Sequence, residues 1–137
     1  MEKSTELIKR GYSALVLAYL GDSFYETLAR EYVVGDGNCS ISEINGKIKN
    51  YVTAVSQSRI AAAVIPHLNE TESEFFKYGR NAHNSHRSKS AHALEYRRAT
   101  GLECLFGYLY LSGSFARARE LFSLAVSCEP EQEEENG

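Results

Sequence analysis

The sequence predicts an all-α protein, folded as a single bundle of about seven helices. Apolar residues recur at three- and four-residue spacing in nearly every segment between turns, which is the period of a helix with one buried face. Sustained apolar–polar alternation, the mark of a strand, is absent from the sequence, and so is any internal repeat. A chain of 137 residues is long enough to bury one core and too short for a second ordinary domain.

The longest periodic segment, residues 12–34, predicts a long amphipathic helix. Its apolar positions at helical spacing are Leu15, Ala18, Tyr19, Phe24, Tyr25, Leu28 and Tyr32. The turn-forming run Gly-Asp-Gly-Asn at 35–38 ends this helix. Ser40 and Glu43 then form a capping-box pattern, which opens a helix that runs to about Tyr51.

Two further helices follow the capping-box helix, and a polar loop separates them from the rest of the chain. One covers about 54–65, where Pro66 limits it, and the next begins near Asn69 or Thr71 and closes at Gly79. Residues 80–90 are polar and show no periodicity, so we expect a loop.

The C-terminal part of the chain predicts two more helices. The first runs from about Ala91 to Leu111 and stops at Gly113, and the second covers residues 115–126. The last nine residues carry the acids Glu129, Glu131, Glu133, Glu134 and Glu135. Such a stretch has too little apolar area to fold, so we expect a folded domain at 1–128 and a disordered acidic tail at 129–137.

The formal net charge of −3 conceals a basic region, because without the five tail acids it becomes +2. Residues 77–98 hold six Lys and Arg residues against the single acid Glu95, and three histidines lie among them. Charge runs are usually solvated surface, but interleaved amide and imidazole groups can also bond phosphates and 2′-hydroxyls. The candidate RNA-binding residues are Lys77, Arg80, Asn81, His83, His86, Arg87, Lys89, Arg97 and Arg98.

Cysteine usage and hydropathy indicate a cytoplasmic protein with no membrane span. Cys39, Cys104 and Cys128 are widely spaced and form no Cys-x-x-Cys pair, as expected for reduced thiols without a zinc site. The longest apolar run, residues 14–20, is far shorter than the roughly 20 residues that cross a bilayer.

Two apolar segments each carry one carboxylate where a buried helix face is expected. Asp22 lies beside Gly21 in the first long helix, and Glu103 lies in the apolar stretch 99–111. A buried carboxylate is costly unless a cation or hydrogen-bond donors offset it, and two of them can hold a hard divalent metal. Asp22 could instead be a surface acid paired with a lysine. For Glu26, one turn further on, we favour such a structural pairing with a basic neighbour.

These segments resemble the ribonuclease III catalytic domain. Residues 20–26 (Leu-Gly-Asp-Ser-Phe-Tyr-Glu) are similar to its signature, and residues 103–111 (Glu-Cys-Leu-Phe-Gly-Tyr-Leu-Tyr-Leu) are similar to its second carboxylate segment. Between them, residues 79–83 (Gly-Arg-Asn-Ala-His) resemble the Gly-Arg-Asn-Ala loop of the compact branch, Mini-ribonuclease III. The resemblance extends from about Tyr12 to Val126, and the chain has no room for a double-stranded-RNA-binding domain.

The resemblance implies an endoribonuclease that cleaves double-stranded RNA. Asp22 and Glu103 would be catalytic and would bind Mg²⁺, which activates water and neutralises charge on the phosphate. A homodimer would form a shared valley with one metal centre per protomer, and we expect Tyr19, Phe24 and residues 101–111 at its interface. The implied cellular role is maturation of large-subunit ribosomal RNA precursor.

The sequence departs from the family pattern at three positions. Ala18 and Thr100 stand where the larger enzymes carry carboxylates, and His83 stands where a lysine is usual. Fewer charged ligands weaken affinity for a hard cation. An alternative function is therefore a catalytically silent helical module that binds structured RNA or a ribosomal particle. A third is a helical dimerisation module with no RNA role.

Overall fold

The computed structural model describes residues 2–82 and 91–128, and the regular elements within these ranges are all helices. The all-α class predicted from the sequence is therefore confirmed. The elements are α1 (Thr5–Gly11), α2 (Ala14–Val34), α3 (Ile41–Lys47), α4 (Lys49–Val52), α5 (Ala54–Val64), the 3-10 turn η1 (Ile65–His67), α6 (Glu70–Arg80), α7 (Ala91–Leu111) and α8 (Phe115–Cys128).

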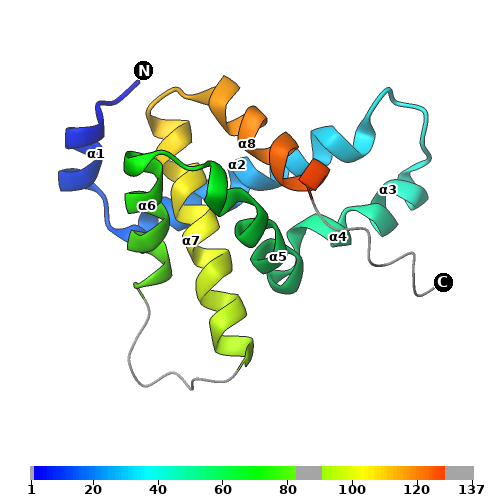
Figure 1. The fold of residues 1–137 in the computed structure, drawn as a ribbon. Coiled ribbons are helices and arrows are strands. Elements are labelled where there is room, and N and C mark those ends of the chain that lie inside the picture. The colour runs from blue at the N-terminus through cyan, green and yellow to red at the C-terminus, as the bar shows by residue number, and fades with distance from the viewer. Residues whose placement is uncertain (1, 83–90, 129–137) are drawn as a thin grey trace.

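Helix α7 is the centre of the bundle, and α2, α5 and α6 all pack against it (Figure 1). Helix α6 lies along one side of α7 and α5 along the other, while α2 crosses behind it in this view. The short helices α3 and α4 form one end of the molecule, and α1 lies at the opposite end. Segments eighty residues apart in the sequence thus meet where α2 and α7 cross.

Two glycines set the distance between α2 and α7. A Cβ atom at Gly21 would overlap the backbone carbonyl of Glu103, and one at Gly107 would overlap the backbone carbonyl of Leu17. The backbones of α2 and α7 are therefore so close at these two positions that no residue larger than glycine fits there. This close approach accounts for a glycine in the middle of α2, where it costs about 1 kcal/mol relative to alanine.

Aromatic side chains fill the core beside this crossing. The ring of Tyr25 packs edge-on against Phe106 and Phe122, with ring centroids 5.6 Å apart in both pairs. The Tyr25 hydroxyl donates a hydrogen bond of 2.7 Å to the carbonyl of Tyr51, which ties α2 to α4. Such a bond satisfies the one polar atom of a buried tyrosine, so the ring can serve both the core and the α4–α5 connection.

A buried ion pair joins α6 to α8. Arg117 donates to both carboxylate oxygens of Glu72, at 2.8 and 2.9 Å, and to the carbonyl of His67 at 2.8 Å. Burial acts to raise the pKa of Glu72, but hydrogen bonds from Arg117 and from the Asn69 backbone N–H outweigh it, so the pKa is lowered. The pair therefore stabilises the fold at neutral pH, and this contribution is lost as the pH falls through the lowered pKa.

The structure corrects two expectations about the N-terminal half. Residues 5–11 form α1, which the sequence did not predict because its only buried residue is Ile8 and so no periodicity is visible. The helix expected over 40–51 is divided into α3 and α4, although the Ser40–Glu43 capping box is present as predicted. Helix α3 buries none of its residues and contains the weak helix formers Asn45 and Gly46, so little holds it in a continuous helix beyond Lys47.

The apolar segment 101–111 belongs mostly to the core of the protomer, which corrects its expected place at a dimer interface. Phe106 is only 1% exposed and packs against Tyr25 and Phe24. Tyr110 is the exposed member of the segment. A charge at Phe106 would therefore disrupt the fold of one protomer and would not report on assembly.

The close approach of α2 and α7 at Gly21 predicts how a substitution there changes the stability of the protein. We expect Gly21→Ala to reduce the free energy of unfolding by at least about 3 kcal/mol, because its Cβ meets backbone that cannot rotate away. Gly46→Ala is the matched control, since nothing lies within 4 Å of a Cβ there, and it should stabilise the protein by up to about 1 kcal/mol. Urea unfolding measures both. Equal effects of the two substitutions would contradict the role given to Gly21.

Candidate active site

Asp22 lies on the surface of α2 beside the α7 crossing. It belongs to a stripe of residues spaced three or four apart on one side of the helix, namely Leu15, Tyr19, Asp22 and Glu26. Its side chain is exposed, which corrects the buried position expected from the apolar residues around it, and only the adjacent Gly21 is buried against α7. Asp22 therefore stands at the rim of the helix contact, where solvent or a ligand can reach it.

Glu103 reaches the same rim from α7 and is largely buried. Burial, the nearby charge of Asp22 and a hydrogen bond to the Asp22 carboxylate together raise the pKa of Glu103 to about 8. A hydrogen bond from the side-chain amide of Gln57 acts in the opposite direction and lowers that pKa. The two carboxylates that the sequence singled out are thus neighbours in space.

This pair of acids fits a divalent cation. Two carboxylates side by side repel each other when both are ionised, so one of them holds a proton unless a cation takes its place. Oxygen ligands of this kind are those that Mg²⁺ prefers. Within residues 2–82 and 91–128, no cluster of three or more His, Cys, Asp or Glu side chains could hold a metal ion, so the site offers two acids.

The positions where the larger enzymes carry further acids lie in the core. Ala18 and Thr100 are both buried, and the Thr100 hydroxyl donates to the carbonyl of Tyr96 within its own helix. A carboxylate at either position would lose its hydration without gaining a partner that the structure shows. Glu26 is held by Arg30 at 2.7 Å, which agrees with the structural pairing we favoured for it.

The predicted RNA-binding residues divide into two groups. Lys77, Arg80 and Asn81 lie at the C-terminal end of α6, and Arg97 and Arg98 lie in the second turn of α7. At 100° per residue, the two arginines point about 120° and 140° away from Glu103 around the helix. Arg97 and Arg98 therefore do not share a helix face with Glu103. His83, His86, Arg87 and Lys89 lie outside the described residues, as does the tail at 129–137.

The sequence reasoning missed Gln57 as a site residue. Gln57 is 3% exposed and stands between Ser56 and Ser58, which are also buried. Three consecutive polar residues cannot all face solvent on a helix packed against a core, and that pattern was the available signal.

A second basic cluster was also missed. Lys47 and Lys49 flank the junction of α3 and α4, and Arg59 lies on α5, two residues after Gln57. The guanidinium of Arg59 donates to the carbonyl of Asn50 at 3.2 Å, which holds it over α4. Lys47 and Lys49 are neighbours in the sequence, and the fold brings Arg59 to them over α4.

Comparison with known proteins identifies the class to which this fold and site belong. Residues 15–114 match the family model described as the ribonuclease III domain, so the chain is an endoribonuclease of the ribonuclease III type. A crystal structure of a Fusobacterium nucleatum protein superposes with a TM-score of 0.74 at 30% identity, covering 90% of this chain and 98% of that one.

Sequence relatives identify the branch. Mini-ribonuclease 3 of Clostridium tetani is 33% identical over 137 residues, which are 99% of this chain and 91% of the relative. Mini-ribonuclease 3 of Symbiobacterium thermophilum is 39% identical over 112 residues, 82% of this chain and 86% of the relative. The chain therefore belongs to the Mini-ribonuclease III family, as the resemblance of its motifs indicated.

In the part of the chain that the structure describes, no helix combines the length and the apolar character that crossing a membrane requires. This agrees with the short apolar runs of the sequence.

The raised pKa of Glu103 predicts how the metal-free protein responds to pH. Its ordinary pKa is 4.5 and its folded pKa is about 8, so the folded state binds more protons between these values and loses stability as the pH rises. In EDTA, Glu103→Gln should therefore unfold at a higher temperature than wild type at pH 8.5, and the difference should shrink toward pH 5. Calorimetry at several pH values measures this. A difference that stays constant with pH would contradict the raised pKa of Glu103.

Proposed function

We propose that this protein is a magnesium-dependent endoribonuclease that cleaves double-stranded RNA, with Asp22 and Glu103 as its catalytic acids. The observation that carries the proposal is the meeting of these two carboxylates at the open rim of the α2–α7 crossing. Membership of a ribonuclease family favours this function over a silent RNA-binding module or a pure dimerisation module. We propose further that the enzyme works in the cytoplasm on ribosomal RNA precursor of the large subunit.

The two acids have different roles because their surroundings differ. Asp22 is exposed on α2 and can reach both a cation and the phosphate that approaches it. Glu103 lies on α7 between Asp22 and Gln57 and would hold a cation in its ionised form. Bound Mg²⁺ would supply the Lewis acidity that activates water and neutralises charge on the scissile phosphate.

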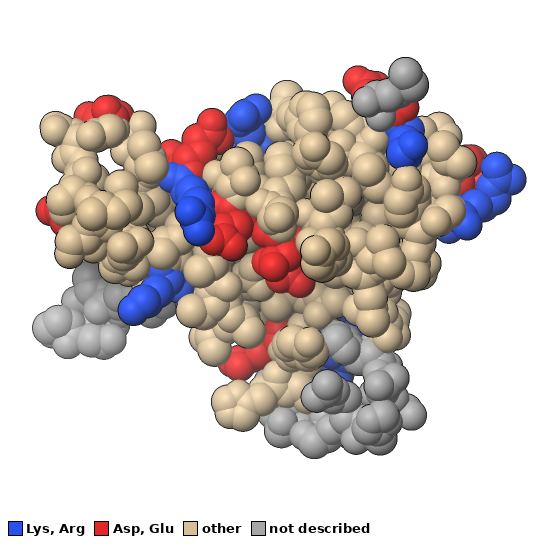
Figure 2. Space-filling model, turned by 180° about the vertical axis from the view of Figure 1, so that it is seen from behind, with Lys and Arg blue, Asp and Glu red and all other residues tan. Residues whose placement is uncertain are grey.

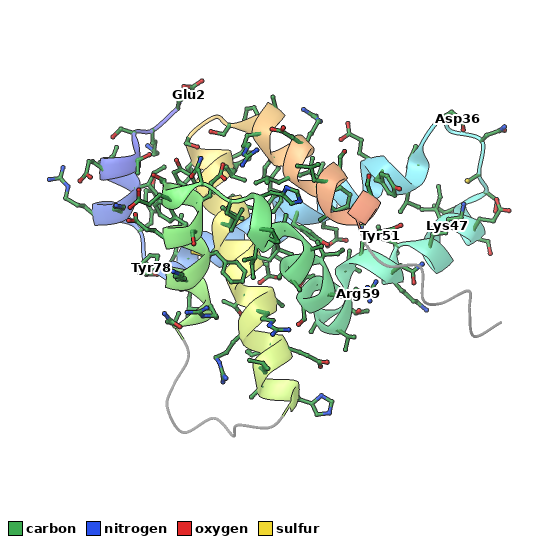
Figure 3. All side chains as sticks on the ribbon, in the orientation of Figure 1. Glu2, Asp36, Lys47, Tyr51, Arg59 and Tyr78 are labelled. Carbon is green, nitrogen blue, oxygen red and sulfur yellow. The ribbon has the colours of Figure 1, made fainter. Side chains whose placement is uncertain are left out.

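We propose that basic side chains hold the RNA on both sides of the acids. On one side are the described residues Lys77, Arg80, Asn81, Arg97 and Arg98, to which the sequence adds His83, His86, Arg87 and Lys89. On the other side is the cluster Lys47, Lys49 and Arg59, and Figure 3 shows Lys47 and Arg59 at the α3–α5 end of the molecule. Contacts of this kind recognise the backbone of an A-form duplex without reading its sequence.

We propose that two copies of the chain pair through the exposed face of α2. Tyr19 is 84% exposed, and Leu15 and Val16 beside it are also exposed, so this helix presents apolar surface that the protomer does not cover. Seen from behind, the molecule shows a broad uncharged face with acidic side chains in its middle (Figure 2). Asp22 follows Tyr19 by one turn on the same stripe. Pairing about a two-fold axis would therefore place two acidic centres in one valley, one for each RNA strand.

The catalytic assignment predicts that Asp22→Asn lowers cleavage of duplex RNA by at least about a hundredfold, because the amide keeps the shape of the side chain and removes the charge that binds the cation. Duplex binding and the unfolding temperature should remain close to wild type. Glu26→Gln is the matched control on the same helix face, since Glu26 is bonded to Arg30. Single-turnover cleavage and filter binding measure the two effects. Cleavage by Asp22→Asn within a few-fold of wild type would remove Asp22 from the site.

The dimer predicts that Tyr19→Asp weakens self-association by about thirtyfold or more, as the loss of a buried aromatic anchor does at protein interfaces. The fold should persist because Tyr19 is exposed in the protomer. Ile41→Asp is the matched control, as Ile41 is an exposed apolar residue that lies on α3 and outside the α2 stripe. Light scattering should give twice the 15.3 kDa chain mass for wild type and control. A monomeric wild type that cuts both strands would contradict the shared valley.

A further inference from the structure

Helix α5 buries three consecutive polar residues, Ser56, Gln57 and Ser58. A buried polar side chain is costly unless it is hydrogen-bonded, and none of the buried side-chain nitrogen and oxygen atoms in the described residues lacks a partner. Ser56 serves the backbone, since its hydroxyl donates to the carbonyl of Lys49 at 3.1 Å. Gln57 instead bonds the carboxylate of Glu103 on α7. The side chain of Gln57 therefore connects α5 to the Asp22–Glu103 site.

The start of α5 is held firmly, so the position of Gln57 is well defined. Thr53 caps the helix by accepting the backbone N–H of Ser56, and its hydroxyl donates to the Ser56 hydroxyl at 2.9 Å. The Tyr25 hydroxyl bonds the carbonyl of Tyr51 just before this cap. Helix α5 then packs along α7. Gln57 lies one turn into α5, so the Thr53 cap and the packing against α7 both fix the backbone that carries its side chain.

The side chain at position 57 is a neutral amide, which leaves the Glu103 carboxylate available to a cation. Glu103 has Asp22 on the α2 side and Gln57 on the α5 side. A lysine or arginine at 57 would neutralise Glu103 permanently and compete with a divalent ion. A glutamine amide orients one carboxylate oxygen through a neutral hydrogen bond and leaves the negative charge available.

We propose that Gln57 is a positioning residue, which holds the Glu103 carboxylate on the side of α7 that faces Asp22 so that both acids share one divalent cation. The inference rests on the proposed function of Asp22 and Glu103. Gln57 itself does not touch the cation. Its contribution is to fix one ligand before the cation arrives, which matters more in a site with two acids than in one with four.

Binding of Mn²⁺ to the RNA-free protein tests this inference without any measurement of cleavage. Gln57→Met keeps the length of the side chain and removes the amide donor. Its affinity for Mn²⁺, measured by electron paramagnetic resonance of the free ion, should fall by about 10- to 100-fold. Gln57→Asn keeps an amide that is one methylene too short and should show a similar loss. Ser56→Ala is the matched control. It removes the hydroxyl that bonds the Lys49 carbonyl but keeps the Thr53 cap on the Ser56 backbone N–H and the packing of α5 on α7, so the unfolding temperature should fall while Mn²⁺ affinity stays unchanged.

Each outcome has a distinct meaning. Wild-type Mn²⁺ affinity in either folded Gln57 variant would overturn the inference, and so would an equal loss in Ser56→Ala, which would show that α5 acts only through its stability. If neither Gln57 variant folds while Ser56→Ala does, Gln57 serves folding and the positioning role is wrong. If Asp22→Asn binds Mn²⁺ as well as wild type does, the proposed function itself fails, whatever Gln57 does.

Discussion

The close crossing of α2 and α7 is the constraint on which the rest of the structure depends. Gly21 and Gly107 let two helical backbones touch, and this contact carries Asp22 and Glu103 to the same rim. With any larger residue at these positions the helices would separate, and the two carboxylates would separate with them. Gly21 and Gly107 thus take no part in the chemistry, and they support the site because they have no side chain.

The surroundings of Glu103 disfavour its ionised form, and a bound cation would reverse that preference. Glu103 holds a proton well above the usual range of a carboxylic acid, because burial and Asp22 both disfavour its charge. A cation that displaces this proton restores two ionised acids and stabilises them together. A binding site that is costly when empty is a common feature of proteins that act on charged substrates.

The sequence predicted the class and most helix boundaries and singled out Asp22 and Glu103 as candidates, because each of these inferences depends on local patterns. The period of α2 and α7, the capping box at Ser40 and the lone carboxylates in apolar runs are all visible within one segment. Contacts between segments were harder to predict. In the sequence Gln57 looks like an ordinary helical residue, and only the packing of α5 on α7 shows that it contacts Glu103. Phe106 looks like excess apolar surface in the sequence, but in the fold Tyr25 covers it. Helix α1 was missed because one buried residue, Ile8, leaves no period to detect.

One measurement tests the central claim most directly, namely the location of bound metal in a crystal of the wild-type protein soaked in Mn²⁺. Anomalous scattering places the ion without reference to activity or assembly. The account predicts a peak with carboxylate oxygens of both Asp22 and Glu103 within coordination distance, about 2.0–2.3 Å. A protein that cleaves duplex RNA while its only bound Mn²⁺ lies away from these two residues would contradict the account.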